Sequence, residues 1–178
     1  MLGVKRNKVT LSPYDEDWAN QYQSTKDELA LILGDNIMNI YHVGSTAIKS
    51  IAAKPILDVA VEIQCFESLN IAGMEAAGYD WCGEHGGPGR YLFVKRRDGD
   101  ISTHHIHCYL PNNENLRTIV LFCEYLNRHP EQAKLYNTLK EELARKYPDD
   151  RNTYTGEKAD FINRTIGLAK EELRTEEV

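Results

Sequence analysis

The dipeptide Asp98-Gly99 separates two segments, 91–97 and 100–110, that are rich in β-branched and aromatic residues. An Asp-Gly pair readily adopts the backbone of a two-residue hairpin turn, whose twist matches that of the flanking strands. A hairpin requires two neighbouring antiparallel strands, so this feature restricts the fold more than any other. An all-helical fold is excluded.

A two-residue turn also predicts which residues of the hairpin face each other. Counting outward from the turn, Leu92 pairs with His105 and Arg90 pairs with His107. The β-carbons of such a pair lie roughly 4.5–5.5 Å apart. A fixed positive charge beside His107 disfavours its protonation and keeps the neutral ring that can bind a metal ion. A bulge near Gly99 would instead shift the register by one residue and turn both histidines away.

Two earlier segments, 37–43 and 56–63, have the pattern of strands. In the second, alternate residues share a face because successive side chains of a strand point to opposite sides. One face carries Leu57, Val59, Val61 and Ile63, and the other carries Asp58, Ala60 and Glu62. A strand with these two faces fits the interior of a small sheet.

Apolar residues at helical spacing predict helices elsewhere. The first begins at Ser12-Pro13, with Ser12 as the cap, and ends at Gly34. Short helices over 46–53 and 67–77 follow, and residues 83–89 form a glycine-rich loop. Three helices are expected in the second half, near 116–126, from Pro130 onward and over 161–169, before a charged tail that frays from Glu171.

This order of elements predicts an α+β fold, with a small mixed or antiparallel sheet, flanking helices and a C-terminal helical half. We expect residues 1–178 to form a single domain, because 178 residues suffice for one full core. The net charge of −6 argues against general nucleic-acid binding. No apolar run approaches the roughly 20 residues of a membrane span, and the N-terminus lacks a signal-peptide pattern. Four scattered cysteines without a C-x-x-C pair suit the reducing cytoplasm.

A candidate site follows the first of these strands. Gly44 allows a phosphate group to approach the backbone closely, Ser45 offers a hydroxyl, and Thr46 continues a turn whose amides suit an anion. Asp58 lies on the next strand and could hold a divalent metal ion, with Lys54 adding positive charge. Read without any resemblance, the same residues also describe a tight turn and a surface acid.

Several separated motifs of the chain resemble the GrpB family. The resemblance spans most of the chain and is carried by Pro13, Trp18, Gly44-Ser45-Thr46, Lys54-Pro55, Asp58, Arg90, His105-Ile106-His107, Leu121-Phe122, Tyr125-Leu126, His129-Pro130, Tyr136, Lys140, Tyr154 and Lys158. That family in turn resembles the DNA polymerase β-like nucleotidyltransferases, in which Gly-Ser binds phosphate and an Asp-x-Asp strand with a third acid binds two metal ions. The resemblance therefore implies a nucleotidyltransferase-like fold and a phosphate-bearing ligand.

The chain departs from the wider superfamily at the second acid, because Ala60 stands where the resemblance requires a carboxylate. Glu62 shares the face of Asp58 but lies about 13 Å from it, at roughly 3.3 Å per residue. Paired metal ions in phosphoryl-transfer sites lie roughly 3.5–4 Å apart. A two-metal mechanism is therefore disfavoured, and we expect one metal ion or none.

Histidines replace acids on the segment 100–110. His105 and His107 share a strand face and could bind one metal ion or a phosphate, or form only a polar, hydrogen-bonded face. A histidine-triad hydrolase needs a third alternating histidine, whereas Thr103 and Tyr109 occupy those positions. We interpret His42, His85, His104 and His129 as structural or solvated.

We expect an enzyme that transfers a nucleotidyl or other phosphoryl group. Asp58 and His107 would bind the metal ion, Mg²⁺ or Mn²⁺ in preference to Zn²⁺, and His105 or His107 would be a ligand or general base. Gly44, Ser45, Thr46, Lys54 and Arg90 would bind the phosphates. The alternatives are a non-catalytic protein that binds a nucleotide or phosphate ligand, and an interaction module built on the acidic helical half.

Overall fold

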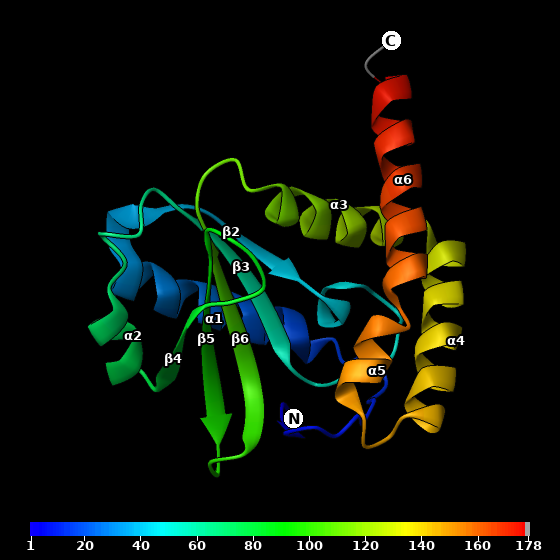
Figure 1. Cartoon of the computed structure of the whole chain (residues 1–178), viewed down its shortest axis with the longest axis horizontal. Coiled ribbons are helices and arrows are strands. Elements are labelled where there is room, and N and C mark those ends of the chain that lie inside the picture. The colour runs from blue at the N-terminus through cyan, green and yellow to red at the C-terminus, as the bar shows by residue number, and fades with distance from the viewer. Residues whose placement is uncertain (177–178) are drawn as a thin grey trace.

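The structure is a computed structural model that describes residues 1–176. Within that range, strands β2 (Ile37–Val43), β3 (Leu57–Ile63), β6 (Ile101–Tyr109), β5 (Arg90–Arg97) and β4 (Tyr79–Glu84) lie in this spatial order in one sheet, and β1 (Val4–Lys5) pairs with β6. Strands β3 and β6 are parallel, and the other neighbours are antiparallel. The sheet is therefore mixed, as expected for this α+β fold (Figure 1).

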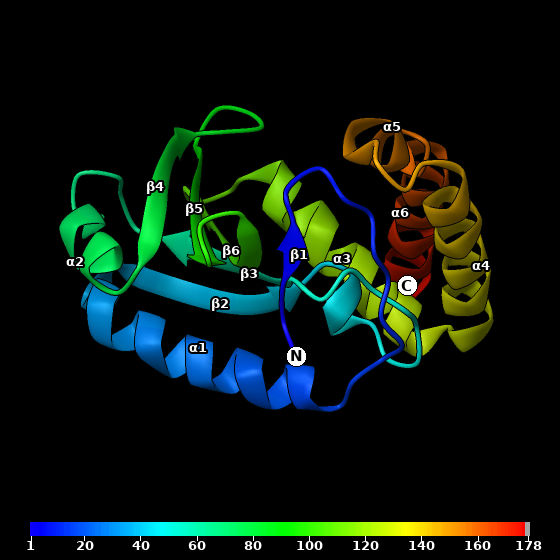
Figure 2. The same ribbon diagram turned by 90° about the horizontal axis from the view of Figure 1, so that it is seen from below.

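The two faces of the sheet are covered by different helices. One face packs against α1 (Asp17–Leu33) and α2 (Ile71–Ala76), and its core contains the alternate β3 residues predicted to share a side. On the other face, Ala60 belongs to a second core that includes side chains from α3 (Glu114–Arg128), α4 (Pro130–Lys146) and α6 (Ala159–Glu176). Figure 2 shows α1 along β2 and the C-terminal helices gathered at the opposite end of the molecule. Asp58 lies on the face turned toward those helices.

The first helix begins later than predicted, at Asp17 instead of Ser12-Pro13. The backbone of Ser12 is extended and exchanges hydrogen bonds with Ala53, at 2.8 and 2.9 Å. The N-cap position is Glu16, which forms no side-chain cap hydrogen bond, and the carboxylate of Asp15 accepts from the amide of Asp17 at 3.0 Å. Gly34 ends the helix with a φ of 53°, as predicted.

The predicted helix over 46–53 is limited to one 3₁₀ turn, η2 (Ser45–Ala47). Beyond it, side chains from the C-terminal helices bind the backbone. Asn127 accepts from the amide of Lys49 at 2.9 Å, and Asn137 accepts from the amide of Ala52 at 2.7 Å. Because these amides bond to side chains from other helices, the segment continues as an irregular loop with a turn at Ser50.

Smaller differences concern element ends and several elements that the pattern did not reveal, among them β1. A 3₁₀ turn, η1 (Gly34–Asn36), follows α1, and α2 begins at Ile71 after Asn70 caps it, which is later than the predicted 67. Strand β4 and helix α5 (Arg151–Gly156) are additional. Helix α6 continues through Glu176 instead of fraying from Glu171, because Glu172 binds Arg128 and His129 at 3.0 and 2.7 Å.

The hairpin register differs from the one predicted. The turn contains three residues, since Arg97 pairs with Ile101, and an irregularity after Lys95 shifts the register by one more residue. Leu92 therefore pairs with His107 and Arg90 with Tyr109. A single shift would have reversed the faces, but two shifts restore them. The histidines keep the predicted face.

None of the described helices is both long enough and apolar enough to cross a membrane.

Candidate functional site

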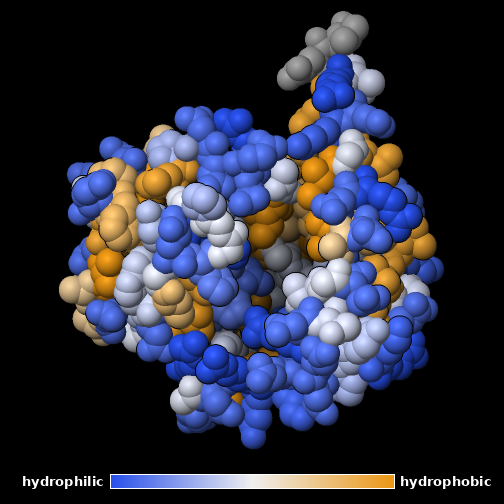
Figure 3. Space-filling view, in the orientation of Figure 1, coloured by the Kyte–Doolittle hydropathy of each residue, from blue (hydrophilic) through white to orange (hydrophobic). Residues whose placement is uncertain are grey.

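A cavity of about 450 Å³ lies between the Asp58 face of the sheet and the C-terminal helices. In the space-filling view the surface is hollowed between these two parts of the molecule (Figure 3). Its walls come from β3, β5, β6, the loop before β3, and helices α3 to α6. The lining residues are Gly44, Ser45, Lys54, Ile56, Asp58, Arg90, His105, His107, Thr118, Ile119, Phe122, Tyr136, Arg151, Tyr154, Thr155, Lys158, Ile162 and Ile166.

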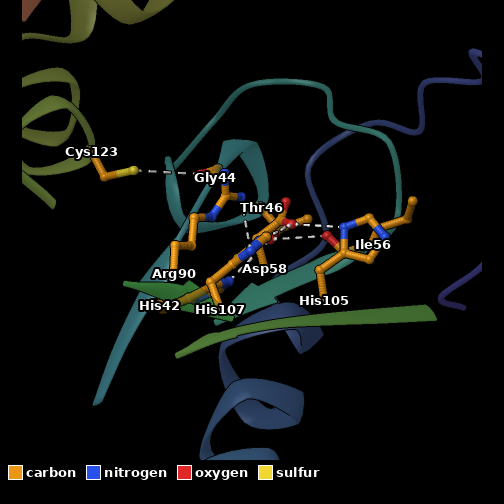
Figure 4. A network of polar contacts seen from close by, with 9 residues as sticks. All are labelled: His42, Gly44, Thr46, Ile56, Asp58, Arg90, His105, His107 and Cys123. Carbon is orange, nitrogen blue, oxygen red and sulfur yellow. Dashed lines mark hydrogen bonds and ion pairs between the residues drawn. The ribbon is translucent and has the colours of Figure 1, made fainter. Parts of the chain in front are cut away.

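Three potential metal ligands meet at the floor of this cleft. Asp58 pairs in register with His105, and Ala60 pairs with His107, because β3 and β6 run parallel. The Nδ1 atom of His105 lies 3.0 Å from Oδ1 of Asp58, and the Nε2 atom of His107 lies 3.4 Å from the same oxygen (Figure 4). One ligand atom from each of the three residues lies within 4.8 Å of the others. Ala60, at the position of the expected second carboxylate, thus has the imidazole of His107 beside it in the sheet.

The charges of this cluster are set by mutual contacts. Partial burial opposes ionisation of Asp58, but hydrogen bonds from His105 and His107 outweigh it and hold the pKa of the carboxyl well below its usual range. Burial lowers the pKa of His107, and Arg90 lowers it further against the opposing effect of Asp58. The side chain of Asp58 is 29% exposed, against 12% for His105 and 9% for His107. A ligand in the cleft can therefore reach the carboxylate while the rings stay anchored.

Arg90 contacts the cluster from β5. Its Nη2 atom donates to Nδ1 of His107 at 2.9 Å, and its Nε atom is buried without a hydrogen-bond partner in the described part of the chain. A buried, unpaired guanidinium N–H is costly, so such groups commonly bind a ligand or water. We predict that Arg90 binds phosphate, and the structure places it among the residues that line the cleft.

Gly44 has a structural role that the sequence alone does not reveal. Its φ is 72°, and a β-carbon at this position would lie 2.6 Å from Oδ2 of Asp58. The glycine therefore allows the turn after β2 to close over the carboxylate. Ser45 lines the cleft together with Tyr136. Burial raises the pKa of the Tyr136 hydroxyl, and Ser45 opposes this rise.

Thr46, predicted to contribute to phosphate binding, has its side chain outside the cleft. It is buried, and its hydroxyl lies 3.0 Å from Nε2 of His42 and 3.5 Å from the carbonyl of Ile56. His42 also stacks on Tyr22, with ring centroids 4.8 Å apart, which agrees with a structural role for this histidine. Thr46 is therefore not among the residues that line the cleft.

Positive charge collects at the end of the cleft formed by α5 and the start of α6. Lys54 and Lys158 lie over the same ring of Tyr154, with Nζ–centroid distances of 5.3 and 4.4 Å, and Arg151 lies nearby. Burial, followed by repulsion from Arg151, lowers the pKa of Lys54 to about 7. Burial also lowers the pKa of Lys158 to about 8. A bound anion would therefore stabilise the protonated form of both amines.

Several residues of the cleft were not predicted as site residues. Arg151 and Tyr154 come from α5 and Lys158 from the turn between α5 and α6, and the position of this segment over the sheet depends on long-range packing. No local pattern marks these three residues as parts of one site. The opposite wall is apolar, and its side chains are Ile119 and Phe122 from α3 and Ile162 and Ile166 from α6.

Helices α3 and α4 hold the loop that follows Gly44. Asn127 and Asn137 accept hydrogen bonds from its backbone amides. The side chain of Lys140 is fully buried, and its amine donates to the carbonyl of Ala52. Burial, followed by repulsion from Lys158, lowers the pKa of Lys140 to about 7. These contacts fix the loop after Gly44 to helices α3 and α4, and both parts line the cleft.

The chain is similar to a family described as GrpB protein, whose profile matches residues 8–167. UPF0157 protein YqkA of Bacillus subtilis is 39% identical over 167 residues, which are 93% of this chain and 48% of that protein. The chain thus spans about half the length of this relative. Glutamate-rich protein GrpB of Alkalihalophilus pseudofirmus is 34% identical over 171 residues, covering 93% of this chain and 98% of the relative.

Solved structures agree with the sequence comparisons. The crystal structure of the conserved protein GrpB from Enterococcus faecalis superposes with a TM-score of 0.85 at 31% identity, covering 92% of this chain and 99% of that one. The Cid1 poly(U) polymerase superposes with a TM-score of 0.51 at 11% identity, over 75% of this chain and 44% of that one. The second likeness concerns the fold alone.

Proposed function

This chain belongs to the GrpB family, and we propose that it binds a nucleotide or another phosphate-bearing small molecule in its cleft, together with a divalent metal ion at Asp58. The observation that carries the proposal is the charge of the cleft. Lys54, Arg90, Arg151 and Lys158 line it, and within residues 1–176 none of the four forms an ion pair with a carboxylate. The four cations are only partly exposed and gather in one cleft without a carboxylate partner among the described residues, so a ligand with several negative charges suits this site.

The cleft has a charged part and an apolar part, which would bind different parts of the ligand. The phosphates would lie between the cations and Asp58, with Gly44 and Ser45 at the turn beside them. The remainder of the ligand would lie against the apolar wall between α3 and α6. Cid1, which shares the fold, has a structure described as MgGTP bound. That description supports a nucleotide as the first candidate to test.

We further propose that the protein transfers a nucleotidyl or other phosphoryl group. A metal ion held by Asp58 would polarise a phosphoryl oxygen when bound. Lys54 and Arg90 would offset negative charge that develops on the phosphates, and the buried cleft would strengthen that interaction. His105 and His107 would orient Asp58 through their hydrogen bonds, which fixes the carboxylate for the ligand.

A second candidate is a binding protein without catalysis. Ala60 favours it, because the parallel neighbour of that residue is His107 and not an acid that could hold a second metal ion. The two candidates share the ligand and the site residues but differ in turnover. Product formation under conditions of saturating binding therefore separates them.

The test is a binding screen with nucleoside mono-, di- and triphosphates and inorganic tripolyphosphate, each with and without divalent metal ions. Thermal unfolding and calorimetry report binding, and a ligand at 100 times its Kd should stabilise the fold by roughly 2.7 kcal/mol. Lys158→Ala should weaken binding, whereas Lys134→Ala, an exposed lysine on α4 outside the cleft, should not. Absence of binding for every phosphate compound, or equal loss in both variants, would refute the proposal.

A further inference from the structure

The ligand atoms at the floor of the cleft are unusual for a fold that resembles Mg²⁺-dependent transferases. They comprise one carboxylate oxygen of Asp58 and two imidazole nitrogens, contributed by His105 and His107 on the adjacent parallel strand. Mg²⁺ prefers oxygen ligands in near-ideal octahedral geometry and usually takes one or two carboxylates plus phosphate oxygens. Imidazole ligands instead suit Zn²⁺, Fe²⁺, Co²⁺ and Ni²⁺.

No second protein oxygen is near to complete a Mg²⁺ site in the described part of β3. Ala60 has no ligand atom, and its neighbour across the strands is His107. Glu62 points along the same face but lies farther down the strand, where its Oε2 accepts a hydrogen bond from Asn39 at 2.7 Å. Glu62 is therefore engaged elsewhere, and β3 offers Asp58 as its single ligand to an ion in the cleft.

We propose that the ion of this site is a transition metal of the Zn²⁺, Fe²⁺ or Co²⁺ type, held by Asp58, His105 and His107, and not Mg²⁺. The inference rests on the metal-binding part of the proposed function and identifies its ion. Two imidazoles and one carboxylate form the ligand set of many catalytic Zn²⁺ and non-haem iron sites, which keep further positions open for a substrate. Here the three residues line the cleft, and the side chain of Asp58 is 29% exposed, so a substrate in the cleft could reach an ion held there.

The protein environment supports this assignment. Both histidines donate to the same carboxylate oxygen, so their ring nitrogens are already directed at one point. An ion there would gain three oriented ligands once the Nε2 proton of His107 moves to Nδ1, which requires Arg90 to give up its hydrogen bond. Their low exposure holds the rings in place, and the parallel strands β3 and β6 hold the backbone. A transition-metal site needs such fixed ligands, whereas Mg²⁺ usually keeps several waters.

The experiment uses the whole chain, stripped with a chelator and titrated calorimetrically with Zn²⁺, Co²⁺, Mn²⁺ and Mg²⁺ in the absence of any nucleotide. We expect Zn²⁺ and Co²⁺ to bind at least about 100-fold more tightly than Mg²⁺. The visible absorption of bound Co²⁺ should report nitrogen ligation. Mg²⁺ binding as tight as that of Zn²⁺ would overturn the inference, as would a lack of Zn²⁺ and Co²⁺ binding.

Variants locate the ion. His105→Ala and His107→Ala should each weaken Zn²⁺ binding by about tenfold or more and change the Co²⁺ spectrum, whereas His85→Ala, in the exposed loop after β4, should change neither. His107→Asp places a second carboxylate beside Ala60 and should shift the preference toward Mg²⁺. Unchanged Zn²⁺ affinity in both alanine variants would contradict the site. Circular dichroism and thermal unfolding confirm that each variant is folded.

The outcomes are separable from those of the proposed function. Phosphate compounds that bind only with Mg²⁺ would refute this inference and leave the proposed ligand standing. Zn²⁺ bound by the three residues, without binding of any phosphate compound, would refute the proposed ligand and leave the metal assignment standing.

Discussion

Arg90 and His107 are in contact although the strand register does not pair them. Arg90 lies opposite Tyr109, yet its Nη2 atom reaches diagonally to Nδ1 of His107 at 2.9 Å. A guanidinium group only donates hydrogen bonds, so Nδ1 is the acceptor and carries no proton. The neutral ring then carries its proton on Nε2, which faces Asp58. Arg90 thus favours the tautomer of His107 whose Nε2 carries the proton, and this proton must move to Nδ1 before Nε2 can bind a metal ion.

Arg90→Met should therefore raise the affinity for Zn²⁺, by about tenfold, because the proton can move to Nδ1 and a nearby positive charge is removed. The same change should lower the affinity for tripolyphosphate. Calorimetric titration of each ligand measures both effects. Arg97→Met, on the same strand beside the turn, is the matched control and should change neither. A fall in Zn²⁺ affinity in Arg90→Met would show that the contact instead supports metal binding.

Asp58→Asn should abolish metal binding and also destabilise the protein by about 1–3 kcal/mol, since two hydrogen bonds to a charged acceptor are weakened. The pKa of Asp58 is below its unfolded value of 3.8. Its ionisation therefore stabilises the fold fully above that pH, and this contribution decreases as the pH falls below it. Denaturant unfolding between pH 7 and pH 3 should show that the free energy of unfolding decreases less toward acid pH in the variant than in the natural chain. Metal affinity equal to that of the natural chain would exclude Asp58 as a ligand.

Gly44→Ala should weaken metal binding through a direct clash, because the added β-carbon would lie 2.6 Å from Oδ2 of Asp58. Gly83→Ala is the matched control, since its φ of 74° is close to the 72° of Gly44 but no atom lies within 4 Å of the added carbon. Both variants should lose roughly 1 kcal/mol or more of stability from the positive φ. Only the first should lose metal affinity, measured by calorimetry. Equal metal affinity in the two variants would mean that Gly44 serves the turn alone.

The affinity for a polyanion should fall as the pH rises from 7 to 9. Burial lowers the pKa of Lys54 to about 7 and that of Lys158 to about 8, and a bound anion favours the protonated amines. Binding therefore takes up protons, and the affinity falls by up to about tenfold per pH unit for each proton taken up. Calorimetry in buffers of different ionisation enthalpy counts these protons. A pH-independent affinity would show that neither amine contacts the ligand.

The same two lysines affect stability in the absence of a ligand. Between pH 7 and about 10, the unfolded chain keeps protons that the folded lysines have lost, since the ordinary pKa of lysine is 10.5. The free energy of unfolding should therefore rise with pH over this window. Lys54→Met should reduce that rise, measured by urea unfolding at several pH values. If the free energy of unfolding rises with pH by the same amount in Lys54→Met, groups other than Lys54 cause the rise.

The sequence predicted the parts of this structure that depend on neighbouring residues. The alternation from Leu57 to Ile63 places Asp58 on the face opposite the first core, and Gly34 ends the first helix, as observed. Asp98-Gly99 marks the hairpin, and Gly44 ends β2. Each of these features follows from side-chain period or from a local φ requirement, which a short segment carries by itself.

Where a segment bonds to distant residues, the local pattern was insufficient. Ser12 could cap a helix, but its backbone pairs with Ala53, and the segment after Gly44 is held by Asn127 and Asn137 instead of forming a helix. The hairpin register depends on a three-residue turn and a shift after Lys95, which no dipeptide signal specifies. The face of the histidines was predicted correctly because the two shifts cancel.

The sequence by itself determined the strands, the glycine turn and the residue types available for chemistry. The tertiary structure decided which of them meet. The parallel pairing of β3 with β6 brings His105 and His107 to Asp58, and the packing of α5 and α6 brings Arg151 and Lys158 over the same cleft. These contacts join residues about 50 to 100 positions apart along the chain, and they form because two apolar faces are buried together. Local propensity cannot specify such contacts, since their energy exists only in the assembled core.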